Sequence, residues 1–252
     1  MPPMRRPRLR DVRALGVAAV AGVGAGIIVG GLGGRLIMKL IALAAEPGAT
    51  GRVTANGNTV GDLTVEGTLA IVVFSGVFSG LIGGLLYLAL RPWLQPLGRW
   101  RGLAFGVAVL ALMGHSVLEP DNFDFRAFGS TALNVGLFAA LFLVFGLVMA
   151  PAFDRFAGAA RGSRAASAVA WLGVVPAILV IALGVGGMVA GLLGQNPEVR
   201  LVFGLLIIGT LLAGAIGRFI GVGRPAALAV VALPLLVGGW VTGSGVARIF
   251  GG

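Results

Sequence analysis

Cysteine is absent from this 252-residue chain, and acidic residues are scarce, with 9 against 19 basic ones. Without cysteine the protein has no disulfides, no thiolate metal sites and no cysteine nucleophiles. Charged residues make up only 11% of the sequence, whereas hydrophobic residues make up 58%. A water-soluble protein needs more polar surface than this composition supplies, so the sequence indicates a membrane protein.

Most of the sequence falls into uncharged runs of 17 to 33 residues. Each run is long enough to cross a hydrocarbon core of about 30 Å, and none alternates apolar and polar residues as the strands of a membrane barrel do. The predicted fold class is all-α, a polytopic helical integral membrane protein with about seven transmembrane helices. We expect a basic cytoplasmic N-terminal segment over 1–13 and a single helical transmembrane domain over 14–252. The runs are 14–34, 67–90, 102–118, 127–153, 165–197, 201–217 and 225–247.

Arginine and lysine are distributed unequally between alternate connections. The N-terminus and the second, fourth and sixth connections carry 13 of them, and the other side carries six. Because translocation of short basic loops is disfavoured, the N-terminus is predicted to be cytoplasmic and the C-terminus outside. The 18 arginines against one lysine favour a GC-rich bacterial genome, hence a multi-pass protein of the bacterial cell membrane. Since the basic residues lie in loops between apolar runs, we expect the lipid bilayer and not nucleic acid as partner.

The segment 35–45, which follows the first run, allows two arrangements. A straight helix over 14–45 would be about 48 Å long, which exceeds the hydrocarbon thickness. A break at Gly33–Gly34 would place Arg35 and Lys39 on the polar face of a short amphipathic segment on the outer surface. Alternatively, the segment belongs to the first transmembrane helix.

Glycine recurs every four positions along the first two predicted helices. Small residues at this spacing form a groove on one helix face, which lets backbones approach closely. We expect these faces to pack against each other or against a partner, either a second copy of the chain or another membrane protein. The glycines are Gly22, Gly26, Gly30 and Gly34 in the first helix and Gly76, Gly80 and Gly84 in the second.

Polar groups suited to chemistry are few, because no aspartate or glutamate lies inside any of the seven runs. The remaining candidates gather around the connection between the third and fourth helices, on the predicted outer side. This candidate outer polar site comprises His115, Glu119, Asp121, Asp124, Arg126 and Asn134. Its spacing matches no calcium or zinc signature, so we expect neither metal nor cofactor. For Asn134 we favour an interhelical hydrogen bond over a role in binding substrate.

Known catalytic patterns are missing from the sequence: there is no G-x-S-x-G elbow, no H-E-x-x-H and no P-loop. We therefore expect a protein that is not an enzyme. Two classes stay open. The small-residue faces and the lack of carboxylates in the runs favour a non-enzymatic membrane-embedded partner or scaffold. The alternative is a small-solute or ion permease or channel, with an outer polar mouth around His115 and Asn134.

Overall fold

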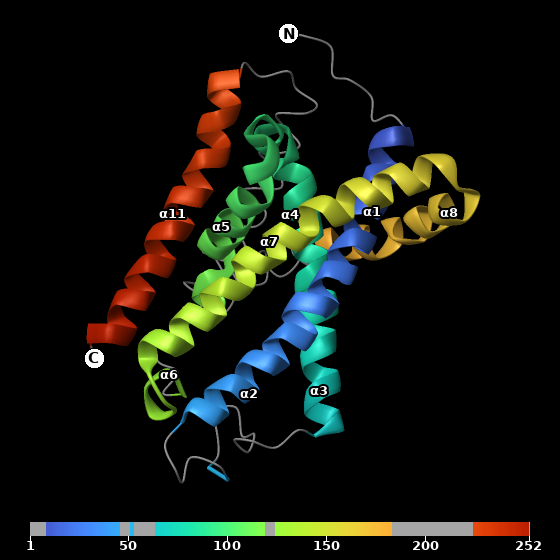
Figure 1. Cartoon of the computed structure of the whole chain (residues 1–252). Helices are drawn as coiled ribbons and strands as arrows, with labels where there is room; N and C mark the ends of the chain where they lie inside the picture. The colour runs from blue at the N-terminus through green and yellow to red at the C-terminus, as the bar shows by residue number, and fades with distance from the viewer. Residues whose placement is uncertain (1–8, 46–50, 53–63, 119–123, 183–223, 252) are drawn as a thin grey trace.

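The computed structural model describes residues 9–45, 51–52, 64–118, 124–182 and 224–251. In this part of the chain every element is a helix (Figure 1), so the predicted all-helical class is confirmed. Five helical segments are long and apolar enough to cross a membrane, which is consistent with a membrane protein. These segments are Val12–Ala44, Val65–Ser116, Thr131–Gly162, Arg164–Ala182 and Val231–Gly251.

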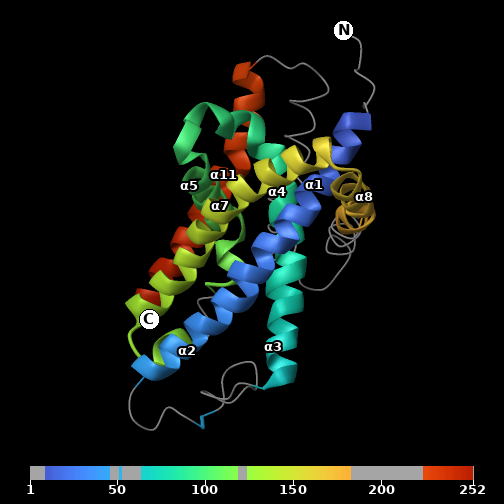
Figure 2. The ribbon, with the colours of Figure 1, turned by 45° about the vertical axis from the view of Figure 1, so that its right-hand side comes forward.

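The first helical rod consists of α1 (Leu9–Gly26), the π-helical η1 (Ile27–Gly33) and α2 (Gly34–Ala44). Of the two arrangements that the sequence allowed, a break at Gly33–Gly34 is contradicted, because both glycines have right-handed helical dihedrals, with φ/ψ of −62°/−42° and −59°/−44°. A π-helical segment keeps the ladder of backbone hydrogen bonds intact, so the helix continues into the segment 35–45. The rod runs obliquely across the second one (Figures 1 and 2).

The second rod consists of α3 (Val65–Ile71), the π-helical η2 (Val72–Phe78) and α4 (Ser79–Leu94). Its first turn is capped by the Thr64 hydroxyl, which accepts a hydrogen bond of 3.1 Å from the Gly67 amide. The chain then turns in η3 (Gln95–Trp100) at Gly98, whose φ of 53° and ψ of −118° suit only glycine. Beyond this turn α5 (Arg101–Met113) runs back in the opposite direction to α4 (Figure 1), so the apolar segment 65–116 folds on itself.

The remaining elements complete the bundle around α5. The chain passes through η4 (Gly114–Ser116) and α6 (Asp124–Ala127) into the long α7 (Thr131–Gly162), which packs on α5. Ser163 has extended backbone, which ends α7, and its hydroxyl caps α8 (Arg164–Leu172). The last element, α11 (Arg224–Gly251), packs on the other side of α5 (Figure 1). The predicted sixth run, 201–217, and the end of the fifth lie outside the described residues, so the count of seven helices stays a prediction.

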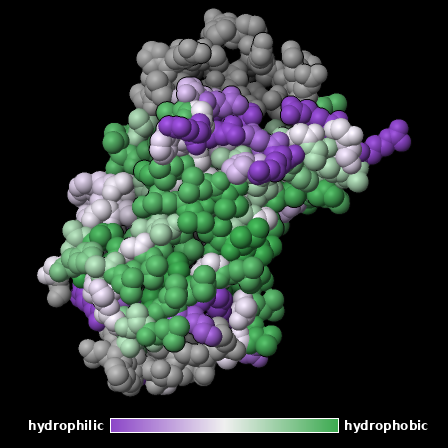
Figure 3. Space-filling view, viewed as in Figure 1, coloured by the Kyte–Doolittle hydropathy of each residue, from purple (hydrophilic) through white to green (hydrophobic). Residues whose placement is uncertain are grey.

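Aromatic rings fill the core where α4, α5 and α7 meet. The centroid of the Tyr87 ring on α4 lies 4.9 Å from that of Phe105 on α5 and 5.3 Å from that of Phe153 on α7. All three side chains are buried. On the surface, a broad hydrophobic band separates polar regions at the upper and lower ends of the molecule (Figure 3). Such a band between two polar ends is expected of a protein that spans a bilayer.

Candidate functional site

Asn134 of the predicted outer polar site lies in the first turn of α7 and is 2% exposed. Its side-chain amide donates hydrogen bonds to the backbone carbonyls of Phe125 at 3.2 Å and Phe128 at 2.7 Å. These are carbonyls of α6 and of the residue directly after it, and the last carbonyls of a helix generally take their partners from outside it. Asn134 therefore fastens the loop between α5 and α7 onto α7. The bond to Phe125 joins α7 to the short helix α6, so Asn134 makes an interhelical hydrogen bond, as the sequence favoured, although its partner is only nine positions away.

Arg126 extends from α6 to the end of α11. Its Nε donates to the carbonyl of Ile249 at 3.1 Å, and its Nη2 donates to the carbonyl of Arg248 at 2.8 Å. The last carbonyls of a helix lack partners inside it and carry a partial negative charge, so a guanidinium satisfies both needs. The arginine predicted for a polar mouth thus holds two helix ends together.

The other members of the predicted site are placed only in part. His115 lies in η4, where its side chain is partly buried, and Asp124 is the first residue of α6. Glu119 and Asp121 lie outside the described residues. Apolar residues close to the described members in the sequence, or bonded to them, pack together. Leu118, Phe125, Val135 and Ile249 form a buried cluster.

A cavity of about 160 Å³ lies between the two rods, α5 and α7. Its walls are apolar side chains such as Phe142 and Phe145, together with glycines and three serines, Ser75, Ser79 and Ser116. Two of the three serine hydroxyls donate hydrogen bonds to backbone carbonyls, Ser79 to Phe74 and Ser116 to Met113. The lining is therefore mainly apolar, with the serines as its polar side chains.

The predicted glycines of the two rods lie against each other where the rods cross. We call Gly22, Gly26, Gly30, Gly76, Gly80 and Gly84 the glycine seam. A methyl group on Gly26 would overlap the carbonyl oxygen of Gly76, and one on Gly84 would overlap that of Ala18. Gly34 is looser, because the nearest atom to such a methyl group is a side-chain carbon of Ile71 at 3.8 Å. Within this chain, therefore, the seam brings backbone against backbone.

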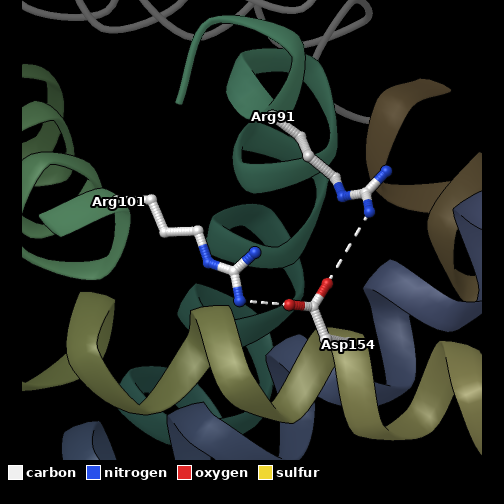
Figure 4. Close-up of polar contacts among 3 residues, drawn as sticks. All are labelled: Arg91, Arg101 and Asp154. Carbon is white, nitrogen blue, oxygen red and sulfur yellow. Dashed lines mark hydrogen bonds and ion pairs between the residues drawn. The ribbon is translucent and has the colours of Figure 1, made fainter. Parts of the chain in front are cut away.

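The sequence reasoning missed a group of charged residues near the upper end of the bundle, shown in Figure 4. Asp154 of α7 accepts a hydrogen bond from Nη2 of Arg101 at the start of α5, and its other oxygen lies 3.6 Å from Nη2 of Arg91 on α4. We call these three residues the arginine–aspartate cluster. It joins α4, α5 and α7, and each side chain is about one-third exposed, at 31–32%. The cluster carries one net positive charge.

Asp154 did not count as an acid inside an uncharged run, because the fourth run ends at residue 153, directly before it. One signal in the sequence was available. Between residues 79 and 118 and between 131 and 172, six arginines are accompanied by a single acid. A lone carboxylate among so many cations is expected to pair with one of them.

The chain was compared with protein families, curated proteins and solved structures. No family model, curated protein or solved structure matches it.

Proposed function

We propose that this protein is a non-enzymatic, membrane-embedded partner or scaffold. The observation that carries the proposal is the use made of its polar side chains. Asn134 and Arg126 bind backbone carbonyls, and Asp154 ties two arginines on neighbouring helices. In the described part of the chain these groups hold helices together, and the cavity between the helices is mainly apolar.

The partner surface we propose uses glycines that the seam leaves free. Gly24 on α1, Gly136 on α7 and Gly243 on α11 meet no other described residue within 4 Å of an added methyl group. Open small-residue positions let a second helix approach closely, whereas the seam glycines are already occupied. Either a second copy of the chain or another membrane protein would fit such a surface.

The experiment isolates the protein from its native membrane in polymer-bounded lipid discs and weighs the complexes. We expect to find a dimer or a complex with a stoichiometric partner. At least one of three substitutions should abolish this complex without lowering the melting temperature of the protein: Gly24→Leu, Gly136→Leu or Gly243→Leu. A monomer in the native discs, with no stoichiometric companion, contradicts the scaffold proposal. So does a complex that survives all three substitutions unchanged.

A permease or channel is the second candidate, and the cavity between helices is the observation that favours it. Flux of monovalent and divalent cations and of small neutral solutes in reconstituted vesicles separates the two candidates. The scaffold proposal expects flux no greater than in empty vesicles. Flux that is lost in His115→Ala would support a permease with its mouth at the predicted outer polar site.

The proposed topology has seven helices, a cytoplasmic N-terminus and an outer C-terminus. It is supported by the arginine and lysine counts and by the picture of the fold, in which α1 begins near the upper end and α11 finishes near the lower end (Figure 1). Because the chain has no cysteine, single cysteines report sidedness directly. Ser130→Cys and Gly251→Cys should react with an impermeant thiol reagent in intact cells, whereas Gln95→Cys and Gly162→Cys should not. The reverse pattern would invert the topology.

A further inference from the structure

In the arginine–aspartate cluster, Arg91 is held in place by two contacts but donates no hydrogen bond to a described residue. Arg91 lies with its Cζ 5.1 Å from the centroid of the Phe153 ring, a cation–π geometry. Its nearest carboxylate oxygen, on Asp154, is 3.6 Å away, which is an ion pair but too long for a hydrogen bond. Its Nε is buried and has no hydrogen-bond partner in the described residues. A guanidinium carries five N–H donors, and Arg91 makes no hydrogen bond to a described residue, so the donors on its two Nη atoms remain for an acceptor from outside the described residues.

The charge of the cluster specifies what kind of acceptor this is. Asp154 neutralises one of the two arginines, and one positive charge is left over. Arginines predominate in the segments around the cluster, because Arg99, Arg155, Arg161 and Arg164 bring the total to six against the single acid Asp154 between residues 79 and 118 and between 131 and 172. A monoanion with two oxygens in one plane fits the fork of a guanidinium, as a phosphodiester does.

The position of the cluster at the edge of the hydrophobic band specifies where that anion comes from. Polar residues cap the band at the upper end (Figure 3), and the cluster side chains are about one-third exposed. Trp100 next to Arg101 is 57% exposed and lies under the guanidinium of Arg99 at 5.2 Å. Exposed tryptophans prefer the headgroup level of a bilayer. At that level the abundant phosphodiesters belong to lipids.

We propose that the arginine–aspartate cluster binds the phosphodiester of an anionic phospholipid, with Arg91 as the main donor. The lipid headgroup would accept hydrogen bonds from Arg91. Asp154, which pairs with both Arg101 and Arg91, would hold the two guanidinium groups in place. Basic sites between transmembrane helices are a recognised way to hold such headgroups. The lipid would then connect α4, α5 and α7 at their shared end.

The test measures lipid retention by native mass spectrometry of the full chain in neutral detergent. Short-chain phosphatidylglycerol and phosphatidylcholine with identical acyl chains are the probes, since both carry a phosphodiester and only the first is a net anion. We expect phosphatidylglycerol to bind roughly tenfold more tightly, and Arg91→Gln to remove about that factor. Equal binding of the two lipids would overturn the proposal.

Arg161→Gln is the matched control, because it removes the same charge from an exposed arginine outside the cluster. It should change the affinity for phosphatidylglycerol by less than about twofold. A loss as large as that of Arg91→Gln would mean diffuse surface attraction and would contradict a specific site. Arg91→Lys keeps the charge beside Asp154, and hence the fold, but lacks the fork. It should still lose several-fold in affinity, and full affinity in this variant would refute the assignment of Arg91.

Inorganic phosphate and glycerol phosphate form a separate arm of the same experiment. At millimolar concentration neither should displace the lipid, because neither carries the acyl chains that the band accommodates. Displacement by either one would assign the cluster to a soluble anion and overturn the lipid proposal.

Discussion

Helix α4 packs on two sides by different means. Toward α1 it presents Gly80 and Gly84, and what an added side chain would meet there is backbone, such as the carbonyl of Ala18. Toward α5 and α7 it presents Tyr87, which contacts the rings of Phe105 and Phe153. At the interface with α1, glycines without side chains let the two backbones touch. At the interface with α5 and α7, large aromatic side chains fill the space between the helices.

The lipid surroundings that we propose set the same requirement at both interfaces. Lipid tails are as apolar as leucine, so burying a side chain between helices gains little transfer free energy, and close packing must supply the attraction. Both interfaces achieve close packing, but their tolerance differs. Backbone atoms in the glycine seam cannot move without moving a helix, whereas a ring can rotate. The predictions below use this difference, and all four are measured as unfolding free energies in detergent or bicelles.

Gly84→Ala should have the largest effect. The new methyl group would overlap the carbonyl of Ala18, so the two rods must separate. We expect a loss of about 3 kcal/mol, the upper end for overpacking. Gly24→Ala on α1 is the matched control, because its methyl group meets nothing within 4 Å and alanine favours a helix by about 1 kcal/mol over glycine. Equal effects at the two positions would mean that the seam is not tight.

Phe105→Ala tests the aromatic side of α4. In water, truncating a buried phenylalanine costs about 3–5 kcal/mol, but part of that cost is transfer free energy, which largely vanishes in lipid. The void that remains should cost about 2 kcal/mol. A loss above that of Gly84→Ala would contradict the view that the seam is the less tolerant interface.

Gly83→Ala sharpens the comparison, since Gly83 is the neighbour of Gly84 but faces α7. Its methyl group would lie 2.6 Å from two carbons of the Phe145 ring, which is a side chain that can give way. We expect a loss of about 1 kcal/mol, clearly below that of Gly84→Ala. The two variants share the same gain in helix propensity, so their difference reports only what each methyl group meets. If Gly83→Ala costs as much as Gly84→Ala, ring and backbone are equally rigid.

Tyr87→Phe should have the smallest effect, and of the opposite sign. The Tyr87 hydroxyl is buried and has no hydrogen-bond partner among the described residues, so it is desolvated without compensation. Removing it while keeping the ring should stabilise the protein by about 0.5–1 kcal/mol. Destabilisation would show that the hydroxyl has a partner, for instance an ordered water.

The sequence predicted helices better than it predicted their ends and their polar contacts. The four-residue spacing of glycine indicated a tight face, since that spacing returns to one side of a helix. It did not indicate η1, a π-helical segment that ends at Gly33 and continues directly into α2 at Gly34, nor did it decide whether the segment 35–45 continues the first helix. Pattern reasoning treats glycine pairs as break points, but in a packed bundle the neighbouring helix supplies the contacts that keep them helical.

The predicted outer polar site illustrates the same limit. Six residues were grouped because they lie near one short connection, yet the acceptors of Asn134 and Arg126 are backbone carbonyls. Backbone acceptors are present at every residue, so no sequence pattern marks them. Arg126 meets its acceptors more than 120 positions away along the chain, at Arg248 and Ile249.

By itself the sequence determined the all-helical class with helices long and apolar enough to cross a membrane, because uncharged runs of this length have one economical way to satisfy their backbone hydrogen bonds in lipid. It also determined which faces of the first two helices are small. Only the tertiary structure decided that these faces meet each other, that Asp154 joins Arg91 and Arg101, and that Arg126 closes the end of α11. Each of these pairs residues far apart in the chain, and their approach depends on the crossing of whole helices, which local composition does not encode.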